Sequence, residues 1–198
     1  MHKIVSTITL FSLLLSTNVS AYPGDLYIGL DLYGARNAFD FEANGIHDKP
    51  TIDSSGFTLK FGAILDAGLR LEGYLQGEAF DEAPFDYTND QMAEIGLNLI
   101  KTFDGFSPVV SPFIKAGMGF GSMELDSYYY PDDDTVDAFN LRLGMGLLFY
   151  IAPQVELLGG LDFQWRQWSD VTYYYPSYTK LKTTDTSQRY YLGVNFHF

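Results

Sequence analysis

The sequence predicts an all-β fold, an eight-stranded antiparallel up-and-down transmembrane β-barrel. Three observations predict it. Apolar residues alternate with other residues in eight successive segments, as they do in strands whose two faces meet different surroundings. The second face of these segments carries balanced charge. Short and long connections alternate between the segments, which is typical of barrels in bacterial outer membranes.

The chain begins with the pattern of a secretory signal peptide. Lys3 supplies a positive start, residues 4–15 are mainly apolar, and Val19-Ser20-Ala21 matches a small-residue cleavage site. The apolar stretch is shorter than the roughly 20 residues that a membrane-spanning helix needs. We therefore expect residues 1–21 to be removed and residues 22–198 to form one barrel domain.

One face of every expected strand is free of charge. It consists of alternate residues in the ranges 26–32, 57–63, 69–75, 93–99, 114–120, 139–149, 155–165 and 190–198. A charged side chain at the bilayer midplane would cost roughly 2–4 kcal/mol. We expect this uncharged face to meet lipid.

The opposite face carries six cations and six anions: Asp31, Lys60, Arg70, Glu72, Glu78, Glu94, Lys115, Arg142, Glu156, Asp162, Arg166 and Arg189. A buried charge is costly unless it is paired, and the interior of an eight-stranded barrel is just wide enough for side chains to fill it. These residues are predicted to form an ion-pair network that fills the lumen. The alternative is that they line a narrow, ion-selective channel.

The connections predict which end of the barrel is exposed. Long polar stretches at residues 36–54, 80–90, 123–137 and 168–187 are expected to be extracellular loops, and residues 65–68, 102–111 and 151–154 short periplasmic turns. Aromatic residues near the strand ends predict two interfacial girdles. The outer girdle would contain Phe57, Phe139, Phe163, Trp165, Trp168, Tyr190 and Tyr191, and the inner one Phe103, Phe106, Phe113, Phe149, Tyr150, Phe196 and Phe198.

Tyrosine runs mark two of the expected loops. The candidate recognition residues are Tyr128, Tyr129, Tyr130, Tyr173, Tyr174, Tyr175 and Tyr178. Tyrosine supplies a large amphipathic contact area and is enriched at recognition surfaces. The alternative is that these residues continue the strands and pack on one another.

Composition and motifs favour no cofactor, metal or nucleic acid. The formal net charge of −13 argues against a basic nucleic-acid surface, and the sequence contains no cysteine. The acidic run Asp132-Asp133-Asp134, with Glu124, Asp126 and Asp137 nearby, lacks the ligand spacing of an EF-hand and favours a solvated loop.

Histidines and serines do not specify a catalytic site. His47 lies near Asp48, Ser54 and Ser55 without the spacing of a triad, and His197 has no serine two residues away. We expect no enzymatic activity, with a lipid-modifying enzyme as the less favoured alternative.

Two segments carry a resemblance to a known family. The last strand alternates Tyr190, Leu192, Val194, Phe196 and Phe198, and residues 112–121 alternate with glycine. The chain resembles the small eight-stranded outer-membrane barrels of the OmpA and OmpX type, in the outer membrane protein β-barrel domain family. The resemblance implies an outer-membrane location, lipid and lipopolysaccharide around the barrel, and a C-terminal strand read by the barrel-assembly machinery. A structural or surface-interaction role, with an extracellular protein or glycan as partner, is favoured over a porin-like channel.

Overall fold

The computed structural model describes residues 25–65, 68–85, 89–103, 107–125, 130, 134–174 and 178–198. The predicted signal peptide, residues 1–21, lies outside the described residues. No helix within the described part of the chain is both long and apolar enough to cross a membrane.

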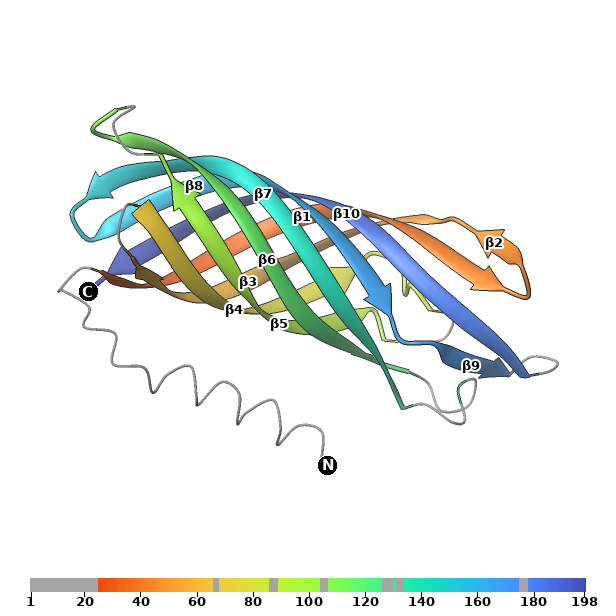
Figure 1. The fold of residues 1–198 in the computed structure, drawn as a ribbon. Coiled ribbons are helices and arrows are strands. Elements are labelled where there is room, and N and C mark those ends of the chain that lie inside the picture. The colour runs from red at the N-terminus through yellow and green to blue at the C-terminus, as the bar shows by residue number, and fades with distance from the viewer. Residues whose placement is uncertain are drawn as a thin grey trace.

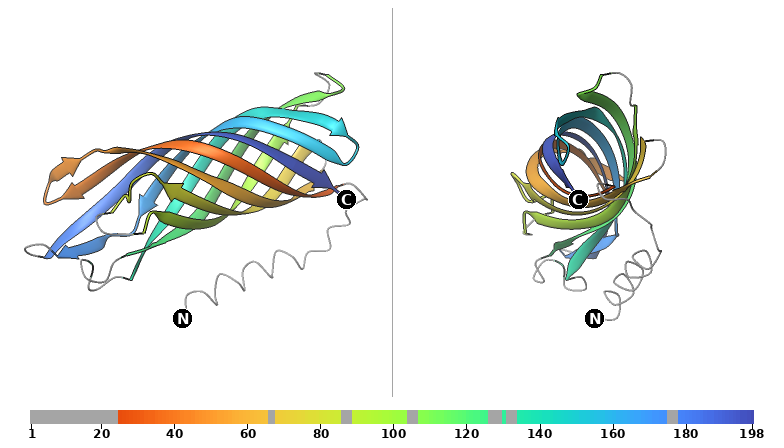
Figure 2. Two further views of the ribbon diagram at one scale, coloured as in Figure 1. Left: turned by 180° about the vertical axis from the view of Figure 1, so that it is seen from behind. Right: turned by 90° about the vertical axis from the view of Figure 1, so that its left-hand side faces the viewer.

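The strands of the described residues form one antiparallel sheet that closes on itself (Figures 1 and 2). Successive strands pair along the chain, and β1 pairs with β10 from Tyr27–His197 to Ala43–Leu181. Because β2 and β9 pair only with the far ends of β1 and β10, the closed barrel has eight strands, and the predicted fold class is confirmed. The elements are β1 (Leu26–Ala43), β2 (Ile46–Asp48), β3 (Thr51–Ile64), β4 (Leu69–Phe80), β5 (Gln91–Thr102), β6 (Val110–Glu124), β7 (Thr135–Ala152), β8 (Val155–Trp168), β9 (Val171–Tyr174) and β10 (Tyr178–His197).

The barrel has two distinct ends. β1 begins and β10 finishes at one end, called here the inner end, whereas β2 and β9 lie at the other, the outer end (Figure 1). β1 and β7 are 18 residues long and β10 is 20. A membrane-spanning strand needs only about 9–11 residues. The strands therefore continue well beyond the length that a bilayer requires.

This continuation corrects the expected loops. Residues 36–54 and 168–187 were predicted as long loops, but most of them belong to strands. The reason is visible at Asn44-Gly45, where both φ angles are positive, 53° and 78°. Such a two-residue turn matches the right-handed twist of a hairpin and favours Asn-Gly. It joins Ala43 directly to its partner Ile46.

The outer wall of the barrel carries a broad band of exposed apolar side chains. Leu32, Leu143 and Leu192 are 64%, 66% and 74% exposed. Contiguous exposed apolar surface of this extent needs an apolar partner. We call the surface the apolar belt; its large exposed members include Ile28, Leu30, Leu32, Phe57, Leu59, Phe61, Leu71, Leu75, Leu99, Ile114, Met118, Phe120, Leu141, Leu143, Met145, Leu147, Leu157, Leu161, Phe163, Trp165, Tyr190, Leu192 and Phe196.

Part of the predicted girdles faces inward instead. Phe113, Trp168 and Tyr191 are 4%, 1% and 6% exposed and lie in apolar clusters inside the barrel. Each has the opposite parity to the belt residues of its own strand, which directs its side chain to the other face. Phe106 lies outside the described residues.

Close packing inside the barrel gives a test of the fold. A methyl group added at Gly62 would overlap the buried ring of Tyr27, whereas at Gly34 the nearest heavy atom would be 4.0 Å away. We expect Gly62→Ala to lower the free energy of unfolding by about 1–3 kcal/mol, and Gly34→Ala to change it by less than about 0.5 kcal/mol. Urea titration of the folded protein in lipid vesicles measures both. Equal midpoints for the two variants would contradict this packing.

Candidate functional site

The interior of the barrel holds many buried polar and charged side chains. All twelve side chains of the predicted network lie inside it, none more than 7% exposed. On every strand they alternate with the residues of the apolar belt, so their side chains point to the opposite, inward face. The site is therefore assembled from all eight strands of the barrel, and its chemistry depends on how the charges pair across the lumen.

The half of the lumen near the inner end contains three direct ion pairs. The Nζ of Lys60 lies 2.6 Å from Asp31 Oδ1, and the Nζ of Lys115 lies 2.7 Å from Asp162 Oδ2. Arg70 donates two hydrogen bonds to Glu156, at 2.7 and 2.9 Å. Glu72 accepts from the hydroxyl of Tyr27 and the amide of Asn98, at 3.1 and 2.8 Å. Every carboxylate in this layer is thus neutralised or hydrogen-bonded.

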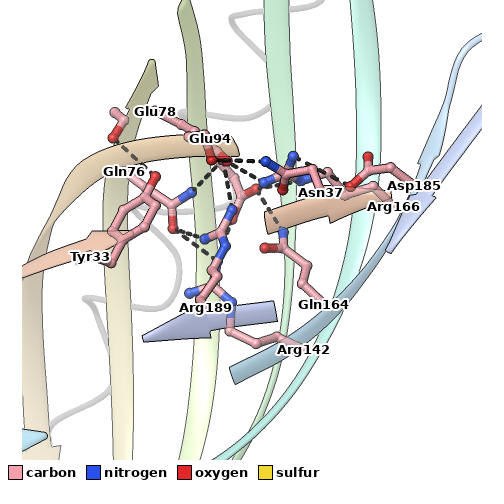
Figure 3. A network of polar contacts seen from close by, with 12 residues as sticks. Tyr33, Asn37, Gln76, Glu78, Glu94, Arg142, Gln164, Arg166, Asp185 and Arg189 are labelled. Carbon is pink, nitrogen blue, oxygen red and sulfur yellow. Dashed lines mark hydrogen bonds and ion pairs between the residues drawn. The ribbon is translucent and has the colours of Figure 1, made fainter. Parts of the chain in front are cut away.

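Three arginines converge on two glutamates further toward the outer end (Figure 3). Arg166 and Arg189 both donate to Glu78 Oε2, the latter at 2.7 Å, and Arg142 donates to Glu94 Oε1 at 2.8 Å. The side-chain oxygen of Gln76 bridges Arg142 and Arg189, at 2.9 and 2.6 Å. Charge-assisted bonds of this kind are about twice as strong as neutral ones. Figure 3 shows the groups meeting at one level of the barrel.

Sequence reasoning missed several members of this network. Asp185 lies 3.7 Å from Arg166 and accepts a 2.7 Å hydrogen bond from the indole of Trp168. His197 lies 3.1 Å from Glu156. Asp185 shares the inward parity of Arg189, but it was assigned to a loop because β10 was expected to begin later. Extending the alternation backward from Arg189 would have found it.

Four tyrosines explain why glycines recur on the inward face. Each ring lies over a glycine of a neighbouring strand, where a Cβ would collide with it, and each carries a cation over its face. The ring-to-cation distances are 4.3–5.7 Å, within the range of a cation–π interaction. The four groups are Gly62–Tyr27–Arg70, Gly56–Tyr33–Arg189, Gly96–Tyr74–Arg142 and Gly160–Tyr191–Lys115.

An apolar layer covers the ionic network toward the outer end. We call it the outer apolar cluster: Phe39, Ile52, Phe80, Phe85, Met92, Met123, Leu125, Tyr130, Val136, Ala138, Trp168 and Val171. Phe85 and Trp168 pack edge to face, with ring centroids 5.3 Å apart, and Phe39 packs on Phe80 at 6.0 Å. Toward the outer end the lumen therefore contains a layer of apolar side chains, which do not attract ions.

The candidate recognition tyrosines are distributed differently from expectation. Tyr130 belongs to the outer apolar cluster and is 1% exposed, so it contributes to the interior and not to an accessible surface. Tyr174 pairs with Tyr178, and Tyr173 with Thr179, in the β9–β10 hairpin. Tyr128, Tyr129 and Tyr175 lie outside the described residues.

The hollows inside the barrel are small. Two cavities among the lumen charges have volumes of about 20 and 10 Å³. A volume of about 10–15 Å³ holds one water. Each of these two cavities is therefore large enough for about one water molecule.

The residues weighed for catalysis are not brought together. His47 Nδ1 lies 2.8 Å from Asp40 and Lys49 Nζ lies 2.9 Å from the same carboxylate, on an exposed hairpin. These hydrogen bonds hold the pKa of Asp40 below its ordinary value. Ser54 instead donates to Glu78 in the interior, at 2.7 Å. Within the described residues no group of three His, Asp or Glu side chains could hold a metal ion; Asp126, Asp132 and Asp133 lie outside them.

Solved structures with this fold include outer-membrane proteins. The chain is similar to neisserial surface protein A, with 19% identity, a TM-score of 0.60, and coverage of 89% of this chain and 99% of that one. It is similar also to the outer membrane protein OprG of Pseudomonas aeruginosa, with 12% identity, a TM-score of 0.60, and coverage of 91% and 99%. The sequence matches no protein-family model and no curated protein sequence. The fold is therefore that of the small eight-stranded outer-membrane barrels.

Glu78 is the common partner of Arg166 and Arg189, so its substitution tests the network. Glu78→Gln leaves Arg166 and Arg189 without their common carboxylate partner, so we expect the free energy of unfolding to fall by about 3–5 kcal/mol. Asp53→Asn, which removes an exposed partner of Arg36, should change it by less than about 1 kcal/mol. Urea titration in lipid vesicles compares the two. A loss at Glu78 no larger than that at Asp53 would show that the buried pairing contributes little.

Proposed function

We propose that this chain is an outer-membrane barrel with a closed lumen, which holds a rigid β-extension at the cell surface for contact with an extracellular protein or glycan. The single observation that carries the proposal is the filling of the lumen: an ion-pair network over the inner part and the outer apolar cluster above it. A barrel filled in both layers is suited to holding a surface and not to conducting solutes.

Membrane residence follows from the apolar belt. Its residues surround the barrel, and the charged side chains of the same strands point away from it. In our proposal residues 1–21 direct secretion and are removed. Tyr190, Leu192, Val194, Phe196 and Phe198 share the outward parity of β10, and we assign them the role of the signal for the assembly machinery. Lipid and lipopolysaccharide would then contact the belt directly.

The extension is the part that a partner would meet. On β1 the belt ends at Leu32, and the strand continues to Ala43, about 35 Å of further strand length. β10 extends similarly to Tyr178, and the outer apolar cluster fills the space between the extended strands. Ordered hairpins bind with a smaller loss of conformational entropy than loops do. Their pairing therefore supports a recognition role, with no enzymatic step.

Tryptophan fluorescence tests membrane residence. The sequence has two tryptophans; Trp165 is 41% exposed on the belt and Trp168 is 1% exposed inside. In vesicles whose acyl chains carry bromine, we expect strong quenching of Trp165 in Trp168→Phe and weak quenching of Trp168 in Trp165→Phe. Equal quenching of the two variants would contradict the assignment of the belt to lipid.

Planar-bilayer recording tests the closed lumen. The wild-type protein should show no steady openings, because in our proposal the paired charges and the apolar cluster close the lumen. The channel alternative makes the opposite forecast: steady currents that disappear in Arg142→Gln or Arg166→Gln. Such currents would replace our proposal with a pore.

Trimmed hairpins test the recognition role. Replacing residues 42–47 by Asn-Gly joins Phe41 directly to its partner Asp48, and replacing residues 172–180 by Asn-Gly joins Val171 to Leu181, so both registers are kept. Cells displaying the wild-type barrel should bind members of a panel of extracellular proteins and glycans, and the trimmed barrels should lose that binding. Identical binding by wild-type and doubly trimmed cells would exclude these hairpins as the contact surface. Unchanged lipid A mass spectra in cells with and without the protein are expected as well, since the proposal includes no lipid-modifying reaction.

A further inference from the structure

The outer wall of the barrel contains a hollow that the closed lumen does not explain. The hollow has a volume of about 410 Å³. Residues of β7, β8, β10, β1 and β3 line it. One wall is formed by Leu141, Leu143, Phe163 and Trp165 of the apolar belt. We call this hollow the lateral groove. Its volume falls within the usual range of binding pockets, about 300–1,000 Å³.

Strand register explains why the wall is hollow there. One row of paired residues runs from Leu141 through Trp165, Thr186 and Ala38 to Thr51. Large side chains at one end of this row give way to small ones on β10 and β1. The neighbouring row runs from Leu143 through Phe163 and Gln188 to Arg36, so a cation closes the far side of the depression.

The two sides of the groove differ in chemistry. The β7–β8 side is apolar and continuous with the belt, so it would accept hydrocarbon chains. The opposite side offers the hydroxyls of Thr51 and Thr186, the amide of Gln188 and the guanidinium of Arg36. Hydroxyl and amide groups suit sugar hydroxyls, and arginine suits phosphate oxygens. The lateral groove lies where the apolar belt ends, on the outer side.

Arg36 is placed to meet an anion. Its side chain is 70% exposed, and its described ion pair uses only Nε, which lies 3.3 Å from Asp53 Oδ1. Exposed pairs of this kind contribute only about 0–1 kcal/mol. A phosphate arriving in the groove can therefore compete with Asp53 for the guanidinium at little cost.

We propose that the lateral groove binds a phosphorylated, acylated glycolipid of the outer leaflet, with acyl chains against Leu143 and Phe163 and a phosphate on Arg36. This assignment rests on the proposed membrane location and adds to it a specific lipid site. The occupant is a single class of molecule, since the groove combines an apolar wall, sugar-binding groups and a cation. Leu143 and Arg36 are three strand spacings apart, about 14 Å.

Native mass spectrometry of the detergent-solubilised, full barrel tests the site with diphosphoryl lipid A and, as the comparison lipid, phosphatidylcholine. The wild-type protein should bind lipid A in preference. Arg36→Gln should weaken lipid A binding about two- to fivefold, the effect of an exposed charge pair, and leave phosphatidylcholine binding unchanged. Asp53→Asn should strengthen lipid A binding, because it removes the competing carboxylate. Ala38→Phe fills the groove and should weaken both lipids.

Matched controls use the same changes elsewhere on the barrel. Lys182→Gln removes an exposed cation of β10 outside the groove, and Ala93→Phe adds the same bulk to an exposed alanine of β5, across the barrel. Both should bind lipid A as the wild type does. The proposal is overturned if Arg36→Gln and Ala38→Phe match the wild type, or if the controls lose binding equally. Quenching of Trp165 by brominated lipid distinguishes failure of the lipid site from failure of the membrane location. If Trp165 is quenched but lipid A is not preferred, only the lipid site in the lateral groove is contradicted. If Trp165 is not quenched, the membrane location is contradicted.

Discussion

Pairing of charge inside a narrow barrel is the constraint on which the rest of this structure depends. Each buried carboxylate or guanidinium would be strongly destabilising without a partner. In the network, oppositely charged groups meet and offset this desolvation cost. Glu78 receives Arg166 and Arg189, while Glu94 receives Arg142. Since the inward face takes up the charges in this way, the outward face of the belt is left to apolar side chains. The same segregation that fills the lumen therefore creates the belt.

The tyrosines and glycines together determine how the interior of the barrel is packed. A ring such as Tyr27 or Tyr74 occupies the space that a side chain would need on the next strand, so glycine is required at that position. The free face of the ring then receives Arg70 or Arg142. This stacking combines close packing with partial compensation of the cation's charge. The two small cavities beside it each have room for about one water molecule.

At the outer end the lumen is occupied by apolar packing and not by ion pairs. Beyond the belt the strands have water on their outer side, so their inward face can bury apolar groups as in a soluble protein. Phe39, Phe85 and Trp168 pack there, closing the lumen and holding the extended hairpins together. In our proposal, closure of the lumen and presentation of a surface have this one structural cause, and the packing favours a role in contact over one in transport. In our proposal the lateral groove adds a lipid contact on the wall below this extension.

The sequence by itself determined the fold class and the two faces of every strand, because alternation with period two depends only on local geometry. The inward set of twelve charges follows from the same rule. Only the tertiary structure decided which charges meet: Arg70 and Glu156 are 86 positions apart, and Arg189 and Glu78 are 111. The stagger between strands sets those partners, and no local pattern encodes it. The full strand lengths, the inward position of Asp185 and Trp168, and the burial of Tyr130 likewise depend on packing around a shared lumen, which one strand read alone does not contain.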